Sequence, residues 1–273
     1  MNQSEHINSM LNSDDLEIVI SGLTLLESLI DDEDTLYEYI PCQNATCFKD
    51  FQIQFLNSHS ALIPLWTMGM LASFKVQWVS KITELKIEDK PLGIIPDLIG
   101  ELKQLKTVQL NNNDLLSVPQ SIGMLCDLKT LNLNDNAVTA LPNTIGHLKS
   151  LEQLSLYNNR LSSLPQQIGQ LNSLKSLYLG GNRLTNLPKT FGNLDHLKEL
   201  DLSSNRLNSV PKYIEQLTHL ERLYLDQNQL TEIPESIGNL TQLKTLNLKD
   251  NQLSDVEKEN ITTKMKHLDK LFI

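Results

Sequence analysis

The chain has 273 residues, a formal net charge of −10 at pH 7 and a hydrophobic content of 40%. The negative charge is concentrated at the start, because residues 1–81 carry 11 acidic side chains against three lysines, whereas the remaining residues are close to neutral. This distribution argues against binding to nucleic acid or to an anionic membrane surface, since both attract basic proteins.

Residues 1–80 are predicted to form a mainly helical capping region. A short helix is expected over residues 1–12, and a second helix with an apolar stripe is expected from Asp14 to Ile30. Most of the large aromatic side chains follow, namely Phe48, Phe51, Phe55, Trp66, Phe74 and Trp78. They suit a cap that closes one end of the core, and the alternative is an independent ligand pocket in residues 36–80.

The first part of the chain has neither the sequence pattern of a signal peptide or membrane span nor that of a cysteine-based metal site. Met1–Asp15 is polar and lacks the basic start of a signal peptide. The longest apolar run, Ala61–Phe74, contains Pro64 and is too short to span a bilayer. Cys42 and Cys47 have no second pair of ligands nearby, so a zinc site is not expected. Free thiols are expected instead, and the alternative is a disulfide between the two. We expect a cytoplasmic location without membrane insertion; the alternative is secretion without a classical signal peptide.

A 23-residue phrase recurs without a gap over most of the remaining chain. Its regular copies begin at Leu105, Leu128, Leu151, Leu174, Leu197, Leu220 and Leu243, after a degenerate copy at Ile82. The regular copies follow the phrase L-x-x-L-x-L-x-x-N-x-L, with valine in place of one leucine in each of the first two, and most continue to Pro-x-x-Ile-Gly-x-Leu, as in Leu151–Leu171. The L-x-L alternation predicts a strand with one buried face, beginning at Val76–Trp78 or Leu85–Ile87. One strand per repeat predicts parallel neighbours, joined by the proline segment as a short helical crossover with the proline in its first turn.

An asparagine stands at the ninth position of every regular repeat, where the chain leaves the strand. The members of this ladder are Asn113, Asn136, Asn159, Asn182, Asn205, Asn228 and Asn251. A side-chain amide at this point can satisfy backbone groups of its own repeat and of the adjoining one. We therefore interpret the asparagine ladder as structural and not as a binding site.

These motifs resemble the leucine-rich repeat family in its 23-residue bacterial and Ras-suppressor-like form, over about two thirds of the chain. The resemblance implies an α/β repeat solenoid, a right-handed arc with a concave parallel β-sheet, here with a helical N-terminal cap. It also implies a protein-binding module without catalysis. The expected organisation is a cap over residues 1–80, a solenoid of about eight repeats over residues 81–254, and a capping helix with a final strand over residues 255–273.

The last repeat departs from the pattern in its second half. Ile261, Met265 and Leu268 have helical spacing, and Asp255 is expected to cap this helix. Residues 268–273 then repeat the strand phrase, which predicts a ninth strand with an unpaired outer edge. Because an open edge is a template for pairing, this strand is a candidate for self-association.

Positions three, five, seven and eight of each repeat are expected to face the concave surface. The candidate partner-binding residues are Tyr157, Tyr178, Asp201, Arg222 and Tyr224, with Arg160, Arg183 and Arg206 stacked at position ten beside them. Tyr and Arg are enriched at binding hot spots, and all four arginines of the chain lie in this region. Gly180 and Gly181 are expected to leave a dip beside Tyr178. The alternative is that tyrosine suits a pleated surface and arginine a solvated rim.

Catalytic motifs are missing from the sequence. It contains no G-x-x-x-x-G-K-[ST] phosphate loop, no H-E-x-x-H and no G-x-S-x-G elbow. His196 and His219 occupy the same position of successive repeats and are expected to stack rather than bind a metal, since no third ligand is evident. No cofactor is expected.

The sequence therefore predicts a non-enzymatic module that binds a protein partner on its concave face. Abundant Asn and Lys with few Arg favour a bacterial source. The alternatives are a secreted effector acting on host proteins, a self-assembling structural protein, and an enzyme with its site in residues 36–80.

Overall fold

The computed structural model describes residues 82–273 of the chain. The helices expected in residues 1–80, the aromatic cap or pocket, Cys42 and Cys47 lie outside the described residues, as does the strand candidate Val76–Trp78.

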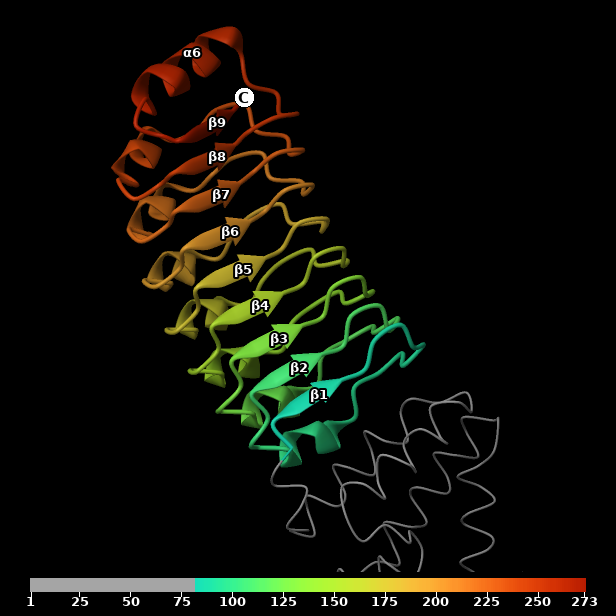
Figure 1. Cartoon of the computed structure of the whole chain (residues 1–273). Coiled ribbons are helices and arrows are strands. Elements are labelled where there is room, and N and C mark those ends of the chain that lie inside the picture. The colour runs from blue at the N-terminus through green and yellow to red at the C-terminus, as the bar shows by residue number, and fades with distance from the viewer. Residues whose placement is uncertain (1–81) are drawn as a thin grey trace, which may run out of the picture.

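Nine short strands form one parallel sheet, in which each strand pairs with the next along the chain (Figure 1). The strands are β1 (Glu84–Lys86), β2 (Thr107–Gln109), β3 (Thr130–Asn132), β4 (Gln153–Ser155), β5 (Ser176–Tyr178), β6 (Glu199–Asp201), β7 (Arg222–Tyr224), β8 (Thr245–Asn247) and β9 (Lys270–Phe272). The register advances by one repeat per strand, so Leu154 of β4 lies opposite Leu131 of β3 and Leu177 of β5. The predicted parallel strands and the ninth strand are confirmed.

Seven 3-10 helices carry the described chain from one strand to the next, and they stack in a second column beside the sheet (Figure 1). They are η2 (Asp97–Glu101), η3 (Gln120–Met124), η4 (Asn143–His147), η5 (Gln166–Gln170), η6 (Lys189–Asn193), η7 (Lys212–Gln216) and η8 (Glu235–Asn239). The proline of each repeat is the N-cap residue, with φ −68° at Pro165, so it stands just before the turn rather than inside it. A Cβ atom at Gly169 would collide with the carbonyl oxygen of Thr190 in the next turn, so the close approach of the two turns requires glycine at this position.

The core is a column of leucine and isoleucine side chains between the sheet and the 3-10 turns. Most of these side chains have no exposed surface, and Phe191 fills the isoleucine position of η6. Full burial of one leucine contributes roughly 1.5–3 kcal/mol. The apolar face of one repeat is covered only by its neighbours, so a repeat is stable as part of the stack and not alone.

The asparagine ladder lies inside the turn that follows each strand, and Asn182 illustrates its contacts. Its Oδ1 accepts the backbone N–H of Leu161 at 2.9 Å, in the preceding repeat. Its Nδ2 donates to the backbone oxygens of Leu156 at 2.8 Å, Leu179 at 3.0 Å and Gly180 at 3.3 Å. The amide thus ties two repeats together through hydrogen bonds to backbone groups of both.

The residue before each ladder position adopts a left-handed backbone conformation. The non-glycine members have φ between 51° and 58°, as at Asn158 and Asp250, and Gly181 has φ 69°. Asn and Asp tolerate this conformation better than most residues, and their side chains also join neighbouring repeats. Asn158 Nδ2, for example, donates to Asp135 Oδ1 at 2.8 Å. Position eight, which was expected on the concave surface, therefore serves the turn.

The C-terminal end is closed by helix α6 (Asp255–Lys264) and then by β9 (Figure 1). The N-cap residue is Ser254, whose side chain accepts the backbone N–H of Glu257 at 3.2 Å. The prediction that Asp255 caps this helix was wrong, because the shorter serine side chain stands one residue earlier. Ile261 and Met265 are buried as expected, but the helix ends before Leu268, which packs against the core from the following turn.

Candidate protein-binding face

The sheet presents one row of side chains per strand to solvent. In most strands the middle residue is buried, while the first and third are partly exposed on the opposite face. Tyr178 pairs in register with Asp201, and Asp201 pairs with Tyr224. Three of the predicted residues therefore lie side by side on β5, β6 and β7. We call the surface made by Tyr157, Tyr178, Glu199, Asp201, Arg222 and Tyr224 the tyrosine face.

Glu199 connects two of the predicted residues, although the sequence analysis did not single it out. Its Oε2 accepts the Tyr178 hydroxyl at 3.0 Å and pairs with Arg222 Nη2 at 3.0 Å. The Glu199 side chain is only 17% exposed. The hydrogen bond to Glu199 raises the pKa of Arg222, and burial followed by this carboxylate raises the pKa of Tyr178. The shared carboxylate fixes both side chains on the surface before any partner arrives.

Tyr157 fills the space expected as a dip at Gly180. A Cβ atom at Gly180 would lie 2.7 Å from Cε2 of Tyr157 and 2.8 Å from the Ser203 hydroxyl. The tyrosine ring therefore packs closely against Gly180, while 38% of the residue stays exposed. The expectation of an open dip beside Tyr178 was wrong, because a ring from the neighbouring repeat occupies it. The glycine holds an aromatic side chain of the face in place.

Carboxylates flank Tyr224 on the same surface. Asp201 Oδ1 accepts the backbone N–H of Ser203 at 2.9 Å and its hydroxyl at 2.6 Å. Burial raises the pKa of Tyr224, and the negative charges of Glu199, Asp201 and Asp226 raise it further. Burial also raises the pKa of Asp226, and Asp201 and Asp250 add to this effect. Asp226 is a second residue that the sequence analysis passed over.

The three predicted arginines at position ten lie beside the face in successive repeats. Their backbone N–H groups bind carbonyl oxygens of the preceding repeat, for example Arg183 to Leu161 at 2.9 Å. The side chains of Arg160, Arg183 and Arg206 are exposed, and no described residue pairs with their guanidinium groups. They stand about one strand spacing apart, roughly 4.8 Å. Unlike Arg222, they have no ion-pair partner among residues 82–273.

Lysines along the start of the strands are, by contrast, neutralised within the chain. Glu152 pairs with Lys175 and, at 3.7 Å, with Lys129 on the two neighbouring strands. Glu221 pairs with Lys244 at 2.8 Å and with Lys198 at 3.7 Å. The hydrogen bonds from Lys175 and Lys244 lower the pKa of the two carboxyl groups. These exposed ion pairs therefore leave few unpaired charges along this edge of the sheet for a partner to bind.

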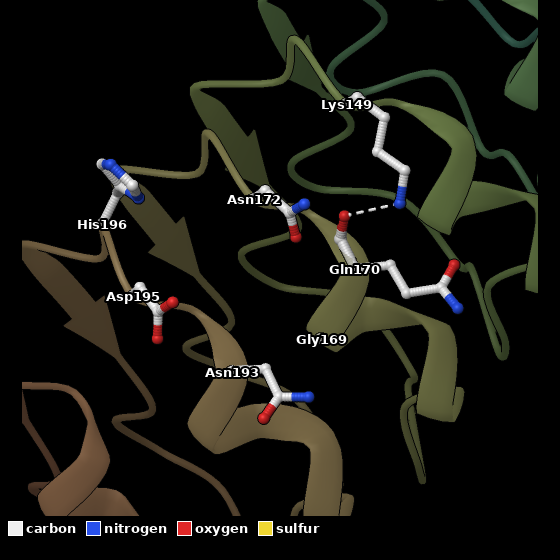
Figure 2. A pocket seen from close by; sticks show the side chains of 7 residues that line it. All are labelled: Lys149, Gly169, Gln170, Asn172, Asn193, Asp195 and His196. Atoms are coloured by element: carbon white, nitrogen blue, oxygen red, sulfur yellow. Dashed lines mark hydrogen bonds between the residues drawn. The ribbon is translucent and has the colours of Figure 1, made fainter.

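An open, polar pocket of about 670 Å³ lies near the start of the strands. It is lined by Lys149, Gly169, Gln170, Asn172, Asn193, Asp195 and His196, and Figure 2 shows Lys149 reaching the backbone oxygen of Gln170 at 2.9 Å. His196 stacks on His219 with ring centres 6.3 Å apart, as the sequence predicted. A ring nitrogen of His219 is bound to the carbonyl oxygen of Asp195 at 2.8 Å. Within residues 82–273 no group of three or more His, Cys, Asp or Glu side chains could hold a metal ion.

Comparisons with known proteins agree with this architecture. A family model described as a leucine-rich repeat region matches residues 73–177 and 162–273. A leucine-rich repeat protein of Leptospira interrogans is 37% identical over 72% of this chain and 56% of its own, with a TM-score of 0.61. An internalin of Listeria monocytogenes is 25% identical over 71% of this chain and 55% of its own, with a TM-score of 0.61.

Larger receptors share the fold as well. The Arabidopsis receptor kinase HAESA, solved in complex with the peptide hormone IDA and the co-receptor SERK1, is 31% identical over 71% of this chain and 32% of its own, with a TM-score of 0.60. The chain thus spans about half the length of the two bacterial structures and a third of this receptor. No curated protein matches it. Helices of the described region fall short of the length and apolar character needed to cross a membrane. By its repeats, its sheet and these matches, the chain belongs to the leucine-rich repeat family.

Proposed function

We propose that this chain is a non-enzymatic module that binds a protein partner on its concave face, centred on the tyrosine face. The observation that carries the proposal is the cluster of half-exposed tyrosines on β5 and β7, with Tyr178 and Arg222 fixed by one carboxylate. Fixed aromatic and arginine side chains lose little conformational entropy on binding, which is why they dominate binding energy at interfaces.

The comparisons support the same kind of function. HAESA was solved bound to a peptide hormone and a co-receptor, so one relative of this fold binds polypeptides. The likeness to the Leptospira protein favours a bacterial source. The charge distribution of the sequence supports a protein partner rather than nucleic acid or an anionic membrane, and we propose a cytoplasmic location.

The test compares two triple variants of the full chain in affinity capture with quantitative mass spectrometry. Tyr157→Ala/Tyr178→Ala/Tyr224→Ala removes the aromatic anchors. The matched control changes partly exposed residues on the N-terminal strands of the same sheet, in Thr107→Ala/Gln109→Ala/Thr130→Ala. We expect the tyrosine variant to lose a partner that the wild type and the control retain. Equal retention by both folded variants would move the site off the tyrosine face.

Self-association through β9 is a second candidate, because no described strand pairs with its outer edge. The strand is only three residues long and carries an exposed lysine, and both features discourage edge pairing. Sedimentation that shifts with concentration in the wild type, and no longer shifts after Leu271→Pro, which removes the N–H on the outer side of β9, would favour self-assembly over binding of a separate partner. Delivery into a host cell as an effector remains a third proposal, tested by finding the chain in host cytosol.

A further inference from the structure

Negative charge on and beside the tyrosine face is only partly balanced by the described residues. Arg222 neutralises Glu199 at 3.0 Å. Asp201 is bound by the neutral groups of Ser203, and the charges that act on Asp226 are those of two further aspartates, Asp201 and Asp250. A half-buried carboxylate beside other carboxylates is destabilised, and a cation placed between them relieves this.

The ring of Tyr224 lies at the centre of this charge. Its strand neighbour in register is Asp201, and Asp226 follows two residues later on the same side of the chain. The side chain of Tyr224 is partly exposed. An aromatic face flanked by carboxylates attracts cations twice, through the ring quadrupole and through charge.

No described cation contacts the ring of Tyr224. The charge of Arg222 reaches Tyr224 and lowers its pKa, but the guanidinium group is held by Glu199. The cation–ring contact within the described residues joins Lys249 to Phe272, at 5.3 Å. The carboxylates are also too dispersed for a metal ion, because no set of three acidic, histidine or cysteine ligands converges within residues 82–273. The arrangement suits a bulky organic cation presented by another chain.

We propose that the partner of the tyrosine face is an extended basic segment, which places a lysine or arginine side chain over Tyr224 between Asp201 and Asp226. This inference rests on the proposed function and adds the chemistry of the partner. The tyrosines supply contact area, and the two aspartates select a positively charged side chain over a neutral or acidic one.

The experiment selects a library of random linear peptides on the immobilised full chain, with counter-selection on Tyr157→Ala/Tyr178→Ala/Tyr224→Ala. Affinities of the selected peptides are then measured for Asp201→Asn/Asp226→Asn, which retains the oxygen that binds Ser203. The matched control is Glu232→Gln/Glu259→Gln, which changes the net charge equally at two exposed carboxylates away from the sheet.

We expect the selected peptides to be enriched in lysine or arginine. Their affinity should fall at least about tenfold for the aspartate variant and less than about twofold for the control, since paired charges at an interface are worth more than distant ones. Tyrosine-dependent peptides without basic residues would overturn this inference and leave the proposed function standing. Equal losses of affinity in both charge variants would show that net charge, rather than Asp201 and Asp226, attracts the peptides. This result would also overturn the inference. A selection that yields no tyrosine-dependent peptide would overturn both this inference and the proposed function.

Discussion

Replacing Asn182 with alanine would remove four hydrogen bonds of the ladder but leave a single backbone group without any partner. The three carbonyl groups that Asn182 binds each keep another donor: Asn159 for Leu156, Asn205 for Leu179 and Asn158 for Gly180. The N–H of Leu161 has the Asn182 oxygen as its acceptor, and both residues are buried. The cost of the substitution therefore concentrates on that one donor.

The magnitude follows from these contacts. An unsatisfied buried N–H costs about 1–3 kcal/mol, and the loss of a typical hydrogen bond adds about 0.5–1.5 kcal/mol. We expect Asn182→Ala to lower the free energy of unfolding by about 2–4 kcal/mol in urea titrations, and Leu161 to lose amide-exchange protection first. The control, Asn172→Ala, changes an exposed asparagine and should stay within about 0.5 kcal/mol of wild type.

The variant Asn182→Asp tests the hydrogen-bond acceptor of this side chain apart from its donor. It keeps an oxygen for Leu161 but places a carboxylate against carbonyl oxygens in a site that is 7% exposed. The folded-state pKa of this aspartate must lie above the unfolded value of about 3.9. The variant should be least stable above that folded pKa and recover as the pH falls, because the protonated acid can donate again. An Asn182→Ala variant as stable as Asn172→Ala would refute the reasoning and show that strand pairing alone holds the turn.

Three further predictions concern single residues. Gly169→Ala should destabilise by about 1–3 kcal/mol because of the Thr190 carbonyl, whereas Gly238→Ala, with no atom within 4 Å, should be neutral or stabilise by about 0.4–1 kcal/mol in the same titrations. Asp226→Asn should raise the free energy of unfolding at pH 7 by less than about 1 kcal/mol, because the folded-state pKa of Asp226 is raised. This gain should disappear as the pH falls below the unfolded-state pKa. An unchanged gain in acid would contradict the raised pKa. Ser254→Ala should cost about 1 kcal/mol by thermal melting through loss of the α6 cap, and no change would show that packing alone sets the start of the helix.

The backbone of the described region was predictable because it depends on spacing. Leucines at Leu154 and Leu156 define a strand wherever the repeat recurs, and the same phrase at the C-terminus identified β9. The role of Asn182 followed from its place at the end of a strand. The stack of His196 on His219 followed from their shared position. Each of these features is set by translation from one repeat to the next.

The surface contacts were less predictable because they depend on side-chain direction. The identity of Glu199 gave no hint that its carboxylate serves Tyr178 and Arg222 together. Gly180 was interpreted as a dip because a glycine lacks a side chain, but the ring of Tyr157, which follows the preceding strand β4, covers it. Glu199 and Arg222 share position three of successive repeats, and Tyr157 and Gly180 share position seven, so periodicity predicts which positions are neighbours. It does not specify the direction in which each side chain points or the partner that it reaches.

The constant register of the sheet also bears on how such a chain can change over generations. Because every strand meets the next in the same alignment, loss of the 23 residues Leu174–His196 would rejoin β4 to β6 with equivalent pairing. Recombination between repeats in the coding sequence can therefore lengthen or shorten the molecule without a new core. An event between β4 and β7 would move Tyr157 relative to Tyr224 by one strand spacing, about 4.8 Å. The length of the tyrosine face thus changes in steps of one repeat. A change in the number of repeats can therefore alter the partners it binds before any single residue is replaced.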